Sequence, residues 1–184
     1  MPLGHTHDRI TLWLLPLIVI ISYVATRNGE ITLLLGAGFF FSGLMFGPDL
    51  DIYSIQFKRW GTLRWIWLPY QKLLRHRSFL SHGFVIGTVI RIVYLLVLLL
   101  TISIFIVAIL QLIVGFNWNW QTFIIQQFNL ITQKYYQEAI ALLLGLEIGA
   151  MSHYISDWLN SAYKNKRKKS RKTKTTRKKT KRRS

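Results

Sequence analysis

The apolar residues of this 184-residue chain gather into four blocks, and this segregation constrains the fold more than any other feature. The blocks cover residues 10–25, 31–46, 84–114 and 140–159 and consist mainly of Leu, Ile, Val and Phe. Charged residues collect between the blocks and at the C-terminus. A soluble helical protein instead shows amphipathic helices with one apolar stripe. The pattern therefore predicts an all-α integral membrane bundle of about four spans with a long third helix.

The block lengths indicate how each helix crosses a bilayer. The third block has 31 residues, which as a helix would be roughly 46 Å long against a hydrocarbon core of about 30 Å. Arg91 marks the level of the headgroups, because arginine at mid-bilayer is costly, so residues 92–114 are expected to span. The first two blocks have 16 residues each, short of the ~20 of a comfortable span. Six of the seven tryptophans lie at block edges or between blocks, as expected of side chains that anchor at the interface. They are Trp13, Trp60, Trp65, Trp67, Trp118 and Trp120.

The net charge of +17 comes mostly from the C-terminal tail, residues 164–184, which holds 14 of the 24 Lys and Arg residues and no acid. With nothing apolar to bury, the tail is predicted to be disordered. This leaves residues 1–163 as a helical membrane domain whose partner is membrane lipid. The tail is suited to bind anionic lipid or nucleic acid, although it offers no aromatic side chain to stack on bases.

Lysine and arginine also predict the orientation, because they are enriched in cytoplasmic loops. With four spans, the N-terminus, residues 47–83 and the tail share one side. That side is the richer in cations, with Arg9, Lys58, Arg59, Arg64, Lys72, Arg75 and Arg77 besides the tail, against Arg27 and Lys134 on the other. We therefore expect a multi-pass protein of the inner (plasma) membrane with both termini in the cytoplasm.

All five histidines and all four aspartates fall in four short clusters, each at the cytoplasmic end of a predicted span. The chain has no cysteine, which excludes thiolate ligands and disulfides. Any one cluster has an ordinary alternative, such as a polar flank, a turn or a helix cap. Their convergence on one face instead predicts a metal site. The candidate ligands are His5, His7 and Asp8; Asp49 and Asp51; His76 and His82; and His153 and Asp157.

The spacings within the clusters suit metal ligation. His153 and Asp157, at i and i+4, lie on one helix face, and Asp49 and Asp51 share a side of an extended segment. Imidazole and carboxylate ligands without thiolate suit a divalent ion, zinc first and iron or manganese next. Nine candidates exceed the ligands of one zinc, so two or three ions are expected, or some residues orient the others. Arg75 and Arg77 are candidates to bind a substrate phosphate, although their cytoplasmic position alone explains them.

Four motifs resemble those of a family of uncharacterised bacterial membrane proteins described only as metal-binding. They are G-H-T-H-D (4–8), G-P-D-L-D (47–51), R-H-R-S-F-L-S-H-G (75–83) and S-H-Y-I-S-D-W (152–158). The chain is more distantly similar to predicted inner-membrane metal-dependent hydrolases, which are grouped with the helical zinc phospholipase C and nuclease fold and its trinuclear zinc site. That similarity implies hydrolysis of phosphate esters. Here His76 and His82 are six apart rather than five, and there are fewer histidines than that cluster uses.

Two features inside the apolar blocks have open interpretations. Glu147 is expected to face the bundle interior or a watery cavity, where it either pairs with Arg91 or supplies another ligand. The GxxxG spacings of Gly43 with Gly47 and of Gly145 with Gly149 suit close helix packing, and chance explains them equally well.

Three classes of function follow. The first is a metal-dependent hydrolase of phosphoester or lipid-headgroup substrates. The second is a non-enzymatic metal-binding scaffold or sensor. The third is a membrane anchor whose basic tail binds anionic lipid or nucleic acid.

Overall fold

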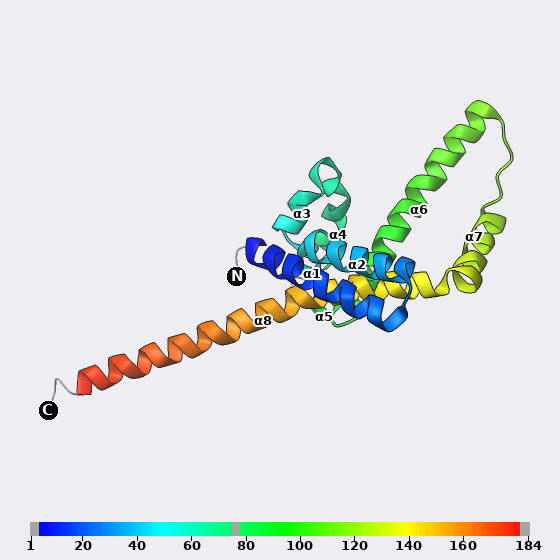
Figure 1. Cartoon of the computed structure of the whole chain (residues 1–184). Coiled ribbons are helices and arrows are strands. Elements are labelled where there is room, and N and C mark those ends of the chain that lie inside the picture. The colour runs from blue at the N-terminus through cyan, green and yellow to red at the C-terminus, as the bar shows by residue number, and fades with distance from the viewer. Residues whose placement is uncertain (1–3, 75–77, 181–184) are drawn as a thin grey trace.

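The structure, a computed structural model, describes residues 4–74 and 78–180, and all regular elements within these ranges are helical (Figure 1). This confirms the all-α prediction for the described residues. The elements are α1 (Gly4–Thr26), α2 (Gly29–Leu44), η1 (Pro48–Asp51), α3 (Ile55–Arg59), η2 (Gly61–Trp67), α4 (Leu68–Leu73), α5 (Phe79–His82), α6 (Ile86–Val114), α7 (Trp120–Asn129), η3 (Leu130–Lys134) and α8 (Tyr136–Thr180).

Helices α1, α2 and α8 lie side by side, and α6 rises away from them (Figure 1). Asn28 ends the short turn between α1 and α2, where its side chain accepts hydrogen bonds from the backbone N–H groups of Glu30 and Ile31. This caps α2 and reverses the chain. As a result, the start of α1, the end of α2 and the middle of α8 come to the same end of the bundle.

Glycines let α2 and α8 approach to backbone contact. A Cβ atom on Gly145 would collide with the carbonyl oxygen of Leu35, and one on Gly149 would lie 2.5 Å from that of Phe39. Gly38 on α2 is also close to α8, since its Cβ would lie 2.7 Å from the oxygen of Leu142. The spacing of Gly145 and Gly149 therefore serves helix packing.

We expect Gly149→Ala to destabilise the protein by about 1–3 kcal/mol, because the added methyl group meets backbone atoms that cannot rotate away. Thermal unfolding of the purified protein measures the loss. Gly29→Ala is the matched control, because no atom lies within 4 Å of its added Cβ. Equal stability of the two variants would contradict this account of the interface.

Three helices are long and apolar enough to cross a membrane: α1 over Thr6–Thr26, α6, and α8 over Tyr136–Tyr163. The remaining apolar block, the second in the sequence, forms α2, which has only 16 residues. Helix α8 does not stop at Tyr163 but continues to Thr180. This differs from the disorder predicted for the tail. Lysine and arginine are good helix formers, and the segment contains neither glycine nor proline.

The main aromatic core lies between residues 46–74 and the first turns of α6. Trp67 is fully buried, and its ring lies 5.1 Å from that of Trp60, edge to face. Tyr94 of α6 donates a hydrogen bond to the carbonyl oxygen of Ile66. Trp67 therefore packs in a protein core, and the prediction that it anchors at an interface is wrong. The core fixes η1 and α3 against the bundle.

Candidate metal centre

His153 and Asp157 lie one turn apart on α8 and face the same space. The Nε2 atom of His153 is 4.0 Å from an oxygen of Asp157. His153 is buried, whereas Asp157 keeps about a quarter of its side chain exposed, at 26%. The pair is therefore reachable from outside on its carboxylate side.

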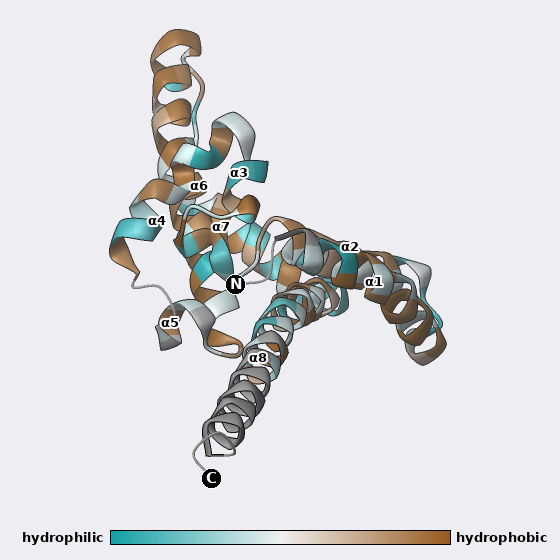
Figure 2. Cartoon of the chain, turned by 90° about the vertical axis from the view of Figure 1, so that its left-hand side faces the viewer, coloured by the Kyte–Doolittle hydropathy of each residue, from teal (hydrophilic) through white to brown (hydrophobic). Residues whose placement is uncertain are grey.

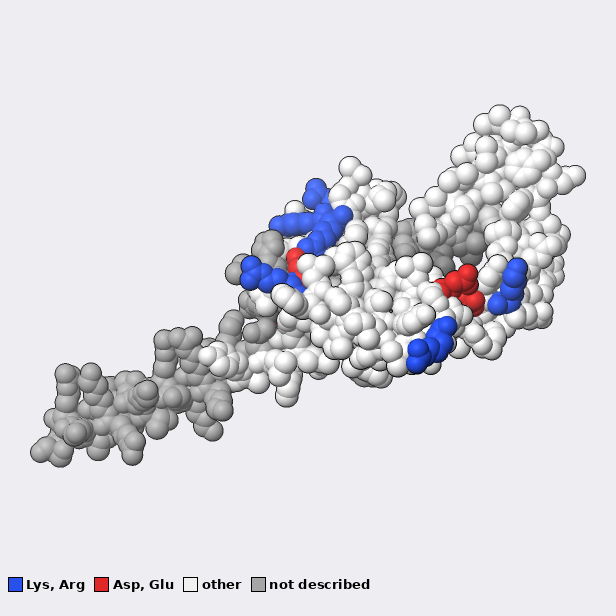
Figure 3. Space-filling model, in the orientation of Figure 1, with Lys and Arg blue, Asp and Glu red and all other residues white. Residues whose placement is uncertain are grey.

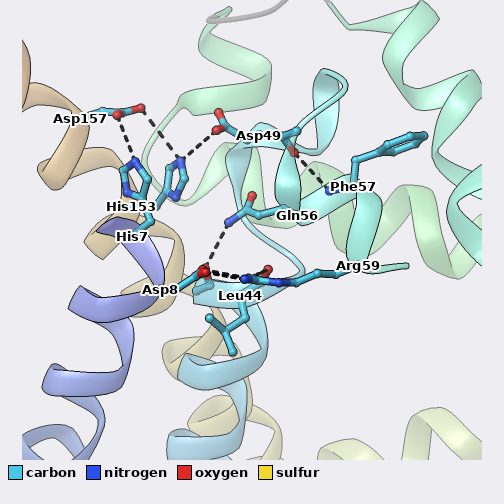
Figure 4. Close-up of polar contacts among 11 residues, drawn as sticks. His7, Asp8, Leu44, Asp49, Gln56, Phe57, Arg59, His153 and Asp157 are labelled. Atoms are coloured by element: carbon cyan, nitrogen blue, oxygen red, sulfur yellow. Dashed lines mark hydrogen bonds and ion pairs between the residues drawn. The ribbon is translucent and has the colours of Figure 1, made fainter. Parts of the chain in front are cut away.

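His7 joins this pair from the first turns of α1. Its Nε2 atom lies 3.3 Å from the second oxygen of Asp157. The imidazole rings of His7 and His153 are stacked, with centroids 3.8 Å apart and planes 23° apart. The ring nitrogens of both histidines and an Asp157 oxygen lie within 4.8 Å of one another. One carboxylate thus bridges two histidines from helices at opposite ends of the sequence (Figure 4).

Asp49 adds a second carboxylate from η1, with an oxygen 3.1 Å from Nε2 of His153. Pro48 begins this short helix, where its missing N–H is not needed. The side-chain amide of Gln71 donates to the carbonyl oxygens of Leu50 and Ile52, each at 3.0 Å. These bonds hold η1 in place, and Figure 4 shows Asp49 and Asp157 on either side of the two imidazoles.

The residues fit a divalent ion. In a tetrahedral site with bonds of 2.0–2.1 Å, ligand atoms are about 3.3 Å apart, and the contacts of 3.1 and 3.3 Å match this spacing. Two carboxylates balance the charge of a divalent cation when both imidazoles are neutral. The Nδ1 atoms of His7 and His153 are buried and have no hydrogen-bond partner among the described residues. Their Nε2 atoms contact the carboxylates and are therefore the ones placed to share an ion with them.

Asp8, next to His7, faces a different partner. Both of its oxygens accept hydrogen bonds from the guanidinium of Arg59, one of them at 2.9 Å. Arg59 also donates to the carbonyl oxygen of Leu44, at the end of α2, at 2.8 Å. The fork ties α1, α2 and α3 together beside the site. The fork therefore anchors the turn of α1 that carries His7 and positions this ligand indirectly, while metal ligation by Asp8 stays a prediction.

We expect Asp8→Asn to weaken metal binding by about tenfold, as loss of a residue that supports a ligand typically does. Arg59→Gln should have a similar effect, because it breaks the same fork from the other side. Competition with a chelating dye measures both. Lys58→Gln, which changes the exposed neighbour of Arg59, is the control. Unchanged affinity in both fork variants would contradict a positioning role.

The other predicted ligands are only partly described. Asp51 is buried in η1 beside Tyr70. The pKa of Tyr70 is raised to about 12, mainly by burial and in smaller part by the Asp51 charge, while Arg91 acts in the opposite direction. Within the described chain the group of His7, His153 and Asp157 includes neither Asp51 nor Asp49, although Asp49 contacts one of its members, His153. His76, Arg75 and Arg77 lie outside the described residues, His82 ends α5, and the side chains of His5 and His82 are not described.

Of the residues that shape the site, reasoning from sequence missed Arg59 and Gln71. Arg59 counted only as a cation that sets topology, and Gln71 carries no motif. The carboxylate of Glu147 accepts the backbone N–H of Val85 at 2.9 Å, and its charge acts on that of Arg91, which favours the first of the two interpretations of Glu147. Arg91 donates to Ser81 O at 3.2 Å and to the Thr88 hydroxyl at 2.9 Å.

Comparison with known proteins supports metal binding. A family model described as "uncharacterized metal-binding protein (DUF2227)" matches residues 2–167. The chain belongs to this family. The match covers α1, η1 and the part of α8 that supplies His153 and Asp157, and it ends near the start of the basic tail. Neither the curated proteins nor the solved structures contain a significant match.

Proposed function

We propose that this metal-binding protein is a multi-pass membrane protein that hydrolyses phosphoesters at the cytoplasmic face. The observation that carries the proposal is the meeting of His7, Asp49, His153 and Asp157. They come from three elements and form a centre with one partly exposed edge. A purely structural ion is usually enclosed by its ligands, whereas a catalytic one keeps an open position.

The distribution of charge and of apolar surface supports a location in the membrane. On the face seen in Figure 3, cations gather at the two ends of the described bundle, and uncharged atoms cover the region between them. Helix α6 leaves large apolar side chains such as Leu96, Phe105 and Ile109 exposed, and most of its ribbon is brown in Figure 2. Soluble monomers rarely expose so continuous an apolar surface.

The chemistry follows from the donor set. When bound, a divalent ion supplies Lewis-acid polarisation of a phosphoryl oxygen. His7 and His153 would hold it through the Nε2 atoms of neutral imidazoles, and Asp157 and Asp49 would supply carboxylate oxygens. Asp157 is the most exposed of the four and faces the opening. A substrate therefore approaches the centre from the Asp157 side. Zinc is the ion we favour, with iron and manganese next.

Hydrolysis of a generic phosphodiester by the protein in lipid nanodiscs tests the enzymatic part. We expect turnover of bis(4-nitrophenyl) phosphate that disappears with a chelator, returns with added zinc and is absent in His153→Ala. Glu138→Gln, at the other end of the membrane part of α8, should retain full activity. If the wild type holds its ion and hydrolyses no phosphoester, the protein is instead a non-enzymatic metal-binding scaffold or sensor.

The topology is testable separately. We expect reporters fused after Met1 and after Ser184 both to report the cytoplasm, because the cations at the site end outnumber those at the other. A reporter inserted between Gly115 and Phe116 should report the opposite side. A cytoplasmic signal from that position, or an external signal at either terminus, would contradict the arrangement.

A further inference from the structure

A cavity of about 640 Å³ adjoins the metal centre. It lies between α6, α8 and residues 78–84, and it shares Asp157 and Pro48 with the site region. Its volume falls within the range of about 300–1,000 Å³ in which proteins hold one small ligand. The cavity therefore places a ligand-sized space directly beside the carboxylate that bridges the two histidines.

Most of the cavity wall is apolar, although it adjoins a polar centre. The side chains that give it this character are Pro48, Phe84, Met151, Tyr154, Ile155 and Trp158. Four of the six lie on α8 within two turns of His153, so this helix carries two of the four candidate ligands and most of these wall residues. Such a wall suits a hydrocarbon or aromatic group rather than a sugar or a free amino acid.

The charges in the cavity point to the chemistry of the polar end. Arg91 and Glu147 both line it, and their opposite charges compensate each other. The Glu147 carboxylate acts electrostatically on the Arg91 guanidinium, so the two groups together add little net charge to the cavity, although Arg91 Nε and Glu147 Oε2 each lack a hydrogen-bond partner among the described residues. The charge available to a ligand is therefore at the metal centre, where a divalent cation attracts an anion. A ligand that fills both parts has an anionic head at the centre and an apolar group in the cavity.

We propose that this cavity binds the apolar group of a phosphate-bearing amphiphile and thereby selects the substrate. This inference rests on the proposed function, which places the phosphate at the ion. The cavity holds one small ligand, so we assign it to a single chain rather than two. Met151 and Phe84 line it as part of the specificity-determining wall.

Calorimetry on the metal-loaded protein in nanodiscs tests the inference without requiring turnover. The probe is octyl phosphate below its micelle concentration, compared with inorganic phosphate and with octanol, each corrected with empty nanodiscs. We expect octyl phosphate to bind at a single site and at least about tenfold more tightly than either fragment, since each buried methylene adds a factor of about four. Equal affinity for octyl phosphate and inorganic phosphate would overturn the proposal, leaving a metal centre that binds free phosphate.

Two variants locate the binding site. Met151→Trp should fill the cavity and remove the preference for octyl phosphate, while inorganic phosphate still binds. The matched control is Leu143→Trp, which places the same side chain at an exposed position on the same helix outside the cavity and should leave the preference intact. Phe84→Ala, which removes an exposed aromatic side chain from the cavity wall, should weaken octyl phosphate binding without changing metal content. If both cavity variants match Leu143→Trp, the proposal is wrong. Tight octyl phosphate binding without hydrolysis would refute the enzymatic function alone and leave the cavity assignment standing.

Discussion

Replacing His153 with Ala is expected to lower the affinity for a divalent ion by more than about 100-fold, beyond the loss that supporting residues usually cause. The His153 imidazole contacts Asp49 at 3.1 Å and stacks on His7 with ring centroids 3.8 Å apart. Its removal therefore takes away one ligand and also the contact that positions Asp49 and His7. Asp157→Ala should have a comparable effect, because this carboxylate contacts both histidines. Competition with a chelating dye measures each affinity.

The matched control is Glu138→Ala, which removes a carboxylate from the first turn of α8. Its side chain is half-buried and lies about four helical turns before His153 on the same helix. We expect the affinity of this variant to equal that of the wild type. An unchanged affinity in His153→Ala would remove His153 from the ligands and with it the proposed centre.

Removing the ion is expected to destabilise the protein by about 4 kcal/mol when the free ion had been present at 1,000 times its dissociation constant. The physical reason is that the ion binds the assembled centre and not the separated helices. Its ligands come from α1, η1 and α8, so binding holds the three elements together. Unfolding followed by tryptophan fluorescence, with and without chelator, measures the difference.

The same experiment on His153→Ala separates this effect from others. A variant that cannot hold the ion should show the same stability with and without chelator. If chelator lowers the stability of wild type and variant equally, the ion acts elsewhere. If it changes neither, the centre does not couple its three elements.

Much of the site's geometry could be predicted from sequence because two simple rules act together. Helical periodicity puts His153 and Asp157 on one face, one turn apart. The alternation of apolar blocks then brings the start of the first helix and the end of the second to the same end of the bundle. His7 and Asp49 meet the α8 pair for this reason, and their metal ligation stays a prediction.

The sequence could not predict which of the neighbouring carboxylates would face the metal centre and which would pair with an arginine. Asp8 follows His7 directly, yet it bonds to Arg59, 51 positions away in sequence. Nothing in a sequence distinguishes a carboxylate that binds an ion from one that binds a guanidinium, because both are short acids near histidine. The burial of Trp67 could not be predicted for a similar reason. A tryptophan between apolar blocks suits a membrane–water interface and an aromatic core equally well.

X-ray absorption spectroscopy on the wild-type protein, purified without chelators, tests the central claim most directly. The claim is that His7, His153 and Asp157, with Asp49, hold a divalent ion. We predict an occupied site with only nitrogen and oxygen neighbours at 2.0–2.2 Å if the ion is zinc, together with outer-shell scattering from imidazole that is weaker for any ion that His153→Ala retains, where only His7 remains. A protein that carries no ion, or a bound ion without imidazole scattering, would contradict the account.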